Sequence, residues 1–96
     1  MKQVGIHRPG EHFDTKVRIT NHGASPTIII GALADCSCVA ARTLPKAIAS
    51  GETVALPVEI HVDSVLGYWR QHVTYLTNDT RQPRLDVELI GRVESH

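Results

Sequence analysis

The sequence predicts an all-β protein, an antiparallel β-sandwich, from three observations. Apolar and polar residues alternate with a period of two along most of the chain, as they do in half-buried strands. Turn-forming residues recur at the spacing of a sandwich, and no window shows the apolar spacing of an amphipathic helix. The turn signals fall at Gly10, 21–24, 50–51, 64–67 and 78–83.

The first two predicted strands cover 12–20 and 26–34. In the first, apolar side chains and a threonine alternate with charged ones, which indicates one buried and one solvated face. The second is more fully apolar, and its β-branched Ile28, Ile29 and Ile30 favour a sheet over a helix. The face of 12–20 expected to lie inside carries Phe13, Thr15, Val17 and Ile19.

The segment 35–49 is too long for a hairpin loop, so we expect one or two short edge strands there, or a crossing between sheets. A regular strand is predicted next, over 53–62. Pro57 faces away from its apolar side and cannot donate to a ladder, which indicates a sheet edge or a bulge. The apolar side carries Val54, Leu56, Val58, Ile60 and Val62.

Two further strands are predicted toward the C-terminus. Trp69, Val73 and Tyr75 share one face of 68–77, and core packing is the role expected for Trp69 and Tyr75. Leu85, Val87 and Leu89 alternate with acidic residues in a last strand that ends at 91–93. His61 and His72 fall on the polar faces of their strands. They would be cross-strand neighbours if those two strands pair, but ordinary solvated histidines are the favoured interpretation.

Composition excludes several classes of function. The 96 residues suffice for a single domain over 1–96, with 42% hydrophobic and 21% charged residues. Ten basic and ten acidic residues cancel and no block of like charge occurs, so we expect no binding to nucleic acid. No apolar run approaches the length of a membrane span, and the N-terminus lacks the apolar region of a signal peptide. The chain is therefore expected to be cytoplasmic, or a module excised from a longer exported protein.

An ordered series of short motifs runs along nearly the whole chain. In this order and spacing the series resembles domain-of-unknown-function family 1573, a bacterial family. The motifs are Gly5, Pro9-Gly10-Glu11, Asn21-His22-Gly23, Cys36-Ser37-Cys38, Ser50-Gly51-Glu52, Gly67-Tyr68-Trp69, Thr77-Asn78-Asp79 and Gly91.

The resemblance implies an immunoglobulin-like sandwich of about seven strands with Greek-key connections, similar to modules of cilium and centrosome proteins and of major sperm protein. It also implies export to the periplasm or lipid anchoring, and an accessory role with no assigned reaction. The chain departs from the family where Cys36-Ser37-Cys38-Val39 replaces the usual Cys-Gly-Cys-Thr. Loss of that glycine makes a tight turn between the cysteines harder.

Cys36 and Cys38 are the one candidate for reactive chemistry, as a redox or thiolate pair. In an extended strand their Cα atoms would lie about 6.6 Å apart on one face, near the upper limit for a disulfide. A bridge would need a kink and would be easily reduced, whereas two adjacent thiolates suit Cu(I) or half of a zinc site. The alternative is a structural role for both as small buried residues, an incidental disulfide included.

The sequence offers no complete site. None of the six histidines shows ligand spacing to the cysteine pair, so no metal site and no cofactor is assigned. The chain has no nucleophile elbow and no phosphate-binding loop, so we expect no catalytic residues and no enzyme. Two hypotheses remain. One is a protein-interaction or structural accessory module that contacts another protein, or another copy of itself, through a sheet edge or an end loop. The other is a redox or soft-metal domain centred on the cysteine pair.

Overall fold

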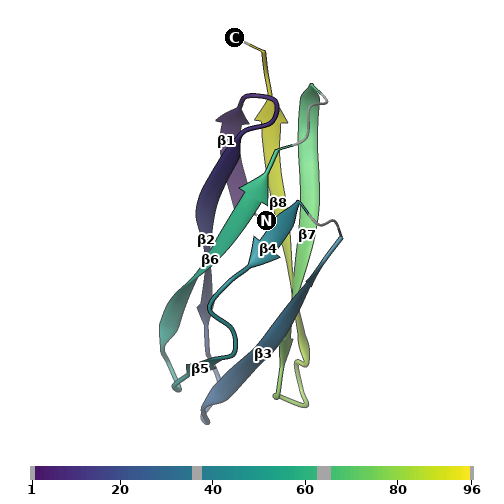
Figure 1. Ribbon diagram of the computed structural model, residues 1–96. Coiled ribbons are helices and arrows are strands. Elements are labelled where there is room, and N and C mark those ends of the chain that lie inside the picture. Colours follow the sequence, from purple (N-terminus) through teal and green to yellow (C-terminus); the bar gives the residue numbers. More distant parts are fainter. Residues whose placement is uncertain (1, 36–37, 63–65, 96) are drawn as a thin grey trace.

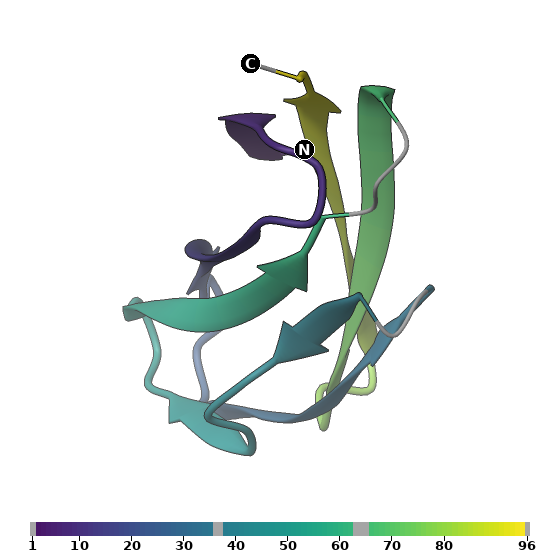
Figure 2. The same cartoon turned by 45° about the horizontal axis from the view of Figure 1, so that its top comes forward.

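Two β-sheets packed face to face form the protein (Figure 1). The structure, a computed structural model, describes residues 2–35, 38–62 and 66–95, and this described part contains eight strands. The larger sheet has the strand order β1-β8-β7-β3-β5 and the smaller one β2-β6-β4, which confirms the all-β sandwich (Figure 2). The strands are β1 (Lys2–His7), β2 (His12–Thr20), β3 (Thr27–Ala34), β4 (Val39–Ala41), β5 (Lys46–Ile48), β6 (Thr53–His61), β7 (Gly67–Thr77) and β8 (Arg84–Val93).

Strands that follow one another in the sequence mostly lie in different sheets. Within the described ranges, β7 and β8 are the one consecutive pair that forms an antiparallel ladder. Repeated crossing between two sheets is typical of Greek-key sandwiches. The segment 35–49 contains β4 at the edge of one sheet and β5 at the edge of the other, so the prediction of short edge strands with a crossing is confirmed.

The core lies between the sheets and is built from the faces that the alternation predicts. All five apolar side chains expected to face inward along 53–62 are buried, and so are Trp69, Val73 and Tyr75 on β7. The indole Nε1 of Trp69 and the hydroxyl of Tyr75 are buried without a hydrogen-bond partner among the described residues. Burial raises the pKa of Tyr75 to about 12. Both aromatic side chains therefore have the packing role expected of them.

β1 differs from the sequence-based expectation, which contains no strand there. It pairs with β8 in parallel, and the register shifts between Gln3 and Ile6. Gly5 lies in this irregular stretch with a φ of 85°, a conformation that favours glycine. The shift interrupts the alternation of side chains, which explains why period two does not reveal the strand.

Pro57 lies on the central strand of the smaller sheet, not on an edge strand. It pairs with Lys16 of β2 in a ladder without a register shift. On the other side of β6, the pairing with β4 covers Val58 to Ile60 and ends next to Pro57. A proline is tolerated here because the remaining bond on this side, from the amide of Arg42 at 3.1 Å, uses the carbonyl of Pro57, and the Arg42 carbonyl accepts from the Thr43 hydroxyl instead.

Asn21 connects the end of β2 to three other parts of the chain. Its side-chain amide donates to the carbonyl oxygens of Ser25 (2.9 Å) and Ile48 (3.0 Å), and its Oδ1 accepts from the amide of Gly23 (2.9 Å). The residue is buried, so these bonds also remove the cost of burying its polar atoms. The predicted turn at 21–24 is thereby fixed against β5.

Candidate binding surface

A hollow of about 520 Å³ lies where β1, β8 and β7 adjoin in the larger sheet. It lies toward the end of the sandwich where β7 begins and β8 ends, at the top of Figure 1. Its lining combines apolar side chains with arginines. The lining residues are Gln3, Gly5, Ile6, Tyr68, Trp69, Arg70, Ile90, Gly91 and Arg92.

The register of the strands arranges these side chains in two rows. Arg92 is paired with Ile6 on one side and with Tyr68 on the other. Ile90 is paired with Gln3 and with Arg70 in the next row. The guanidinium carbon of Arg92 lies 5.3 Å from the ring centroid of Tyr68, within the range of a cation–π contact. Apolar and cationic groups therefore alternate across this surface.

Large apolar side chains are exposed here to an unusual degree. Tyr68 is 89% exposed and Ile6 is 62% exposed. The space beside Gly5 is also open, because a Cβ atom placed on this residue would meet no atom within 4 Å. An apolar, concave surface on a soluble domain commonly marks a binding site.

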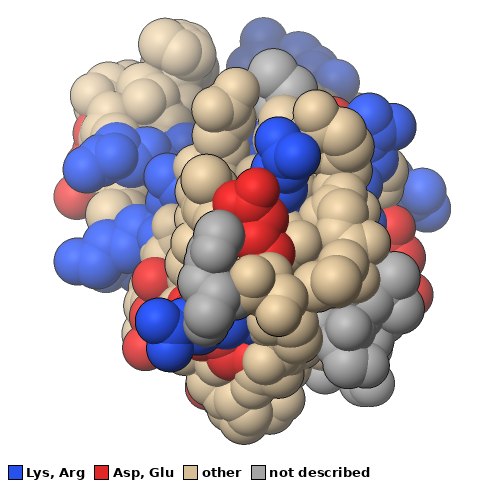
Figure 3. Space-filling model, turned by 90° about the horizontal axis from the view of Figure 1, so that it is seen from above, with Lys and Arg blue, Asp and Glu red and all other residues tan. Residues whose placement is uncertain are grey.

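The charge at the hollow is positive. Arg70 and Arg92 line it, and among the described residues no aspartate or glutamate does. The nearest ion pairs are long, with Arg70 Nε 3.7 Å from Glu88 Oε2 and Arg92 Nε 3.5 Å from Glu94 Oε1. Seen from this end, cationic and anionic side chains are interspersed with tan surface, and no extended block of one sign appears (Figure 3). The positive charge at the hollow is a local feature.

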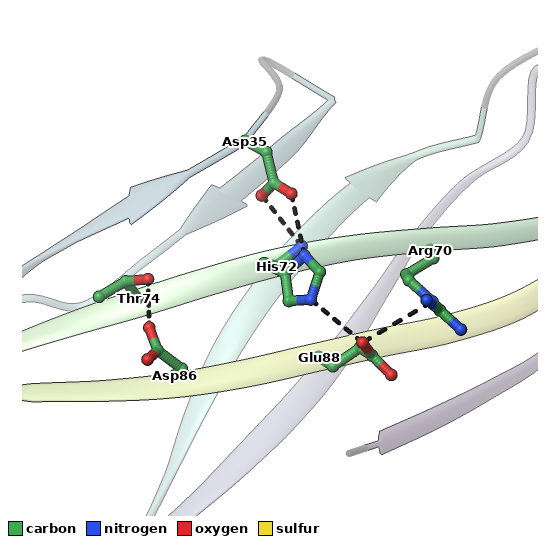
Figure 4. A network of polar contacts seen from close by, with 6 residues as sticks. All are labelled: Asp35, Arg70, His72, Thr74, Asp86 and Glu88. Carbon is green, nitrogen blue, oxygen red and sulfur yellow. Dashed lines mark hydrogen bonds and ion pairs between the residues drawn. The ribbon is translucent and has the colours of Figure 1, made fainter.

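A polar network lies next to the hollow and shares Arg70 with it (Figure 4). His72 Nδ1 lies 3.1 Å from Asp35 Oδ2, and His72 Nε2 lies 3.1 Å from Glu88 Oε2. Asp35 also accepts from the backbone amide of His72 at 3.0 Å. Beside this group, the hydroxyl of Thr74 donates to Asp86 at 2.7 Å. The network joins the end of β3 to β7 and β8.

The two carboxylates around His72 favour its charged form. The hydrogen bond that His72 donates to Asp35 is the main cause that raises the pKa of His72, and the bond to Glu88 adds to it. The same hydrogen bond with His72 lowers the pKa of Asp35. When both ring nitrogens carry protons, each can donate to a carboxylate.

We expect this network to make stability depend on pH. The raised pKa of His72 stabilises the fold fully below the ordinary value of 6.5, and this contribution is lost as pH rises through the folded-state pKa. The lowered pKa of Asp35 contributes above its ordinary value of 3.8 and is lost as pH falls. Urea denaturation should show that His72→Gln lowers the free energy of unfolding more at pH 5 than at pH 8. His22→Gln, at another exposed histidine, is the control, and an equal loss at both pH values in His72→Gln would contradict the prediction.

Among the residues that the structure describes, the polar network does not have the geometry of a catalytic triad. The second nitrogen of His72 faces the carboxylate of Glu88, whereas a catalytic triad places a hydroxyl or thiol there. Within residues 2–35, 38–62 and 66–95, no group of three or more histidine, cysteine, aspartate or glutamate residues could hold a metal ion. The same ranges contain no helix long and apolar enough to cross a membrane.

The predicted redox or thiolate pair is described only at Cys38. Cys36 lies outside the described residues, so the arrangement of the pair stays a prediction. Cys38 is disulfide-bonded, packs against the core, and its carbonyl accepts from the amide of His61 at 2.7 Å. These contacts hold Cys38 beside β6.

His61 and His72 are both exposed, and the strand pairing that would make them neighbours does not occur. β6 and β7 lie in different sheets, so the two residues are not paired. His61 pairs instead with His12 of β2, and the two ring centroids lie 3.8 Å apart. The sequence alone does not identify the hollow. The available signal is that the apolar Tyr68 and Ile90 stand among charged residues on the solvent-facing sides of their strands.

Solved structures with this fold come from distant organisms. A protein of unknown function from Porphyromonas gingivalis W83 matches with a TM-score of 0.73 and 15% identity over 94% of this chain and 42% of that one. The ASH/PapD-like domain 7 of human CEP192 matches with a TM-score of 0.65 and 12% identity over 99% and 82%. The secreted serine protease VesC from Vibrio cholerae gives 0.68 and 13% over 96% of this chain and 21% of the protease. At these identities the likeness shows the fold alone.

A family model covers almost all of the chain. Comparison with curated proteins found no match. The model of the family described as "Protein of unknown function (DUF1573)" matches residues 2–93. The motif series and the immunoglobulin-like sandwich agree with this match. The chain therefore belongs to the DUF1573 family.

Proposed function

We propose that the domain is a non-catalytic protein-interaction module whose contact surface is the hollow between β1, β8 and β7. The observation that carries this proposal is the exposure of Tyr68 and Ile6 around a concave surface that also holds two arginines. Aromatic and arginine side chains are the types most enriched at the centres of protein interfaces. The Arg92–Tyr68 contact holds both groups in place before a partner arrives, which lowers the entropy lost on binding.

The free sheet edges are weaker candidates for the contact surface. β4 and β5, at two of the four edges, have only three residues each and offer a short template for another strand. β2 is nine residues long, but Asp14, Lys16 and Arg18 are exposed along it. Charged residues on an edge strand oppose pairing with other chains. β1, the fourth edge, forms one side of the hollow, which presents side chains of a sheet face and therefore does not depend on adding a strand.

Site-specific photo-crosslinking in the native host tests the proposal. A benzoylphenylalanine placed at position 68 should crosslink one defined protein, identified by mass spectrometry, and the same group at position 16 should not. The additional change Ile6→Asp should lower the yield at position 68 several-fold, because it removes an apolar side chain from the hollow and places a carboxylate opposite Arg92. Ile6 is exposed, so the thermal unfolding midpoint should change little. Equal crosslinking from positions 68 and 16, or none from position 68, would count against the hollow.

A further inference from the structure

We infer that the hollow binds a partner segment in which an apolar side chain is flanked by carboxylates. This inference rests on the proposed function and adds the chemistry of the partner. The apolar part of the segment is indicated by Ile6, Tyr68 and Ile90, which line the same concave surface from three adjacent strands. One side chain entering the hollow would cover apolar area on all three strands at once.

The carboxylates are indicated by the arginines. Arg70 and Arg92 stand one row apart on β7 and β8, in the two rows that carry the apolar side chains. Among the described residues, the acids that approach them are Glu88 and Glu94, at 3.7 and 3.5 Å through Nε. A guanidinium has five N–H donors, so contact at Nε leaves room for a second carboxylate at the terminal nitrogens.

The shared carboxylate of Glu88 strengthens this argument. Its Oε2 atom lies 3.1 Å from His72 Nε2 and 3.7 Å from Arg70 Nε, so the histidine is its nearer partner. Arg70 is also 68% exposed at its side chain. An incoming carboxylate can therefore pair with Arg70 while Glu88 keeps its contact with His72.

Peptide titrations of the ¹⁵N-labelled domain test the inference by NMR. The probes are three blocked pentapeptides, Gly-Asp-Leu-Asp-Gly, Gly-Asn-Leu-Asn-Gly and Gly-Asp-Ala-Asp-Gly. The first should shift the backbone amides of Ile6, Tyr68 and Ile90 and bind about three- to tenfold more tightly than the asparagine peptide, the gain expected of two exposed ion pairs. It should also bind several-fold more tightly than the alanine peptide, which has lost most of its apolar side chain. Arg70→Gln with Arg92→Gln should remove the preference for aspartate over asparagine. Lys16→Gln with Arg18→Gln, an equal loss of two positive charges on the edge strand β2 of the smaller sheet, should leave it unchanged.

The outcomes separate this inference from the proposed function. If the asparagine peptide shifts the same amides as strongly as the aspartate peptide, the hollow binds apolar segments and the carboxylate part is overturned. If the leucine and alanine peptides bind alike, the apolar part is overturned. If no peptide shifts these amides, or if they shift with protein concentration alone as in a contact between two copies, the inference fails as a whole. The photo-crosslink at position 68 then decides the proposed function independently.

Discussion

Replacing Leu89 with alanine is expected to lower the free energy of unfolding by about 3–5 kcal/mol, the range seen when a fully buried leucine is truncated. Leu89 is 0% exposed and lies on β8, which has a hydrogen-bonded strand on each side. Strands on both sides limit how far the backbone can collapse into the space that the side chain leaves. A domain of this size is stabilised by about 5–15 kcal/mol in total, so this one change removes a large share.

Leu33→Ala is the matched control, because it removes the same atoms from the same sheet. Leu33 lies on β3 and is 59% exposed. Its truncation should cost no more than about 0.5 kcal/mol, as for other exposed positions. Urea denaturation of the two variants measures the difference, with an unchanged slope showing that the unfolded state is the same. Comparable losses in both variants would contradict the assignment of the core to the space between the sheets.

The sequence predicts which side chains face the core far better than it predicts which strands pair. Alternation is a property of one strand, and it identifies the buried side of 53–62 without knowledge of any neighbour. Pairing depends on where each connection crosses between the layers, and alternation carries no information on that. For this reason the sequence places His61 on the correct face but does not identify its neighbour, His12.

The candidate binding surface depends on which strands pair, and it is therefore the part that the sequence alone does not predict. Ile6 and Arg92 stand at opposite ends of the chain and become neighbours through the parallel pairing of β1 with β8. Because the register is irregular at Gly5, β1 itself does not show the two-residue alternation of apolar and polar side chains. The exposed face of β7 contains the one available signal, since Tyr68 stands there in the company of Arg70 and His72. A single aromatic residue on a polar face does not specify a site without its neighbours.

Gly91→Ala is expected to separate β1 from β8 and to lower the free energy of unfolding by about 2–3 kcal/mol. A Cβ atom at this position would lie 2.8 Å from Val4 Cγ2 and 3.0 Å from the carbonyl oxygen of Gly5. Val4 can change its side-chain rotamer, but the Gly5 oxygen belongs to the backbone and can move only with its strand. β1 must therefore shift away from β8.

Gly31→Ala is the control for this change, since Gly31 also lies within a strand of the larger sheet and a Cβ atom there meets nothing within 4 Å. It should leave stability unchanged or slightly raised, because alanine restricts the unfolded chain more than glycine does. Hydrogen exchange should show faster exchange of the amide of Glu94, which donates to the carbonyl of His7, in Gly91→Ala alone. Adding Val4→Ala should restore only part of the lost stability, since it relieves the side-chain contact and leaves the backbone one. Full recovery in that double variant, or no loss in Gly91→Ala, would contradict the backbone contact as the cause.

The same substitution connects the packing of β1 to the proposed binding surface. Ile6 reaches the hollow only while β1 lies against β8, whereas Tyr68 and Arg70 are held by β7. Gly91→Ala should therefore weaken binding of the Gly-Asp-Leu-Asp-Gly peptide by removing one apolar wall, while the preference for aspartate over asparagine persists through Arg70. Weaker binding that keeps this preference would show that β1 supplies apolar contact and that β7 supplies charge. Loss of both together would mean that the arginines, too, depend on the position of β1.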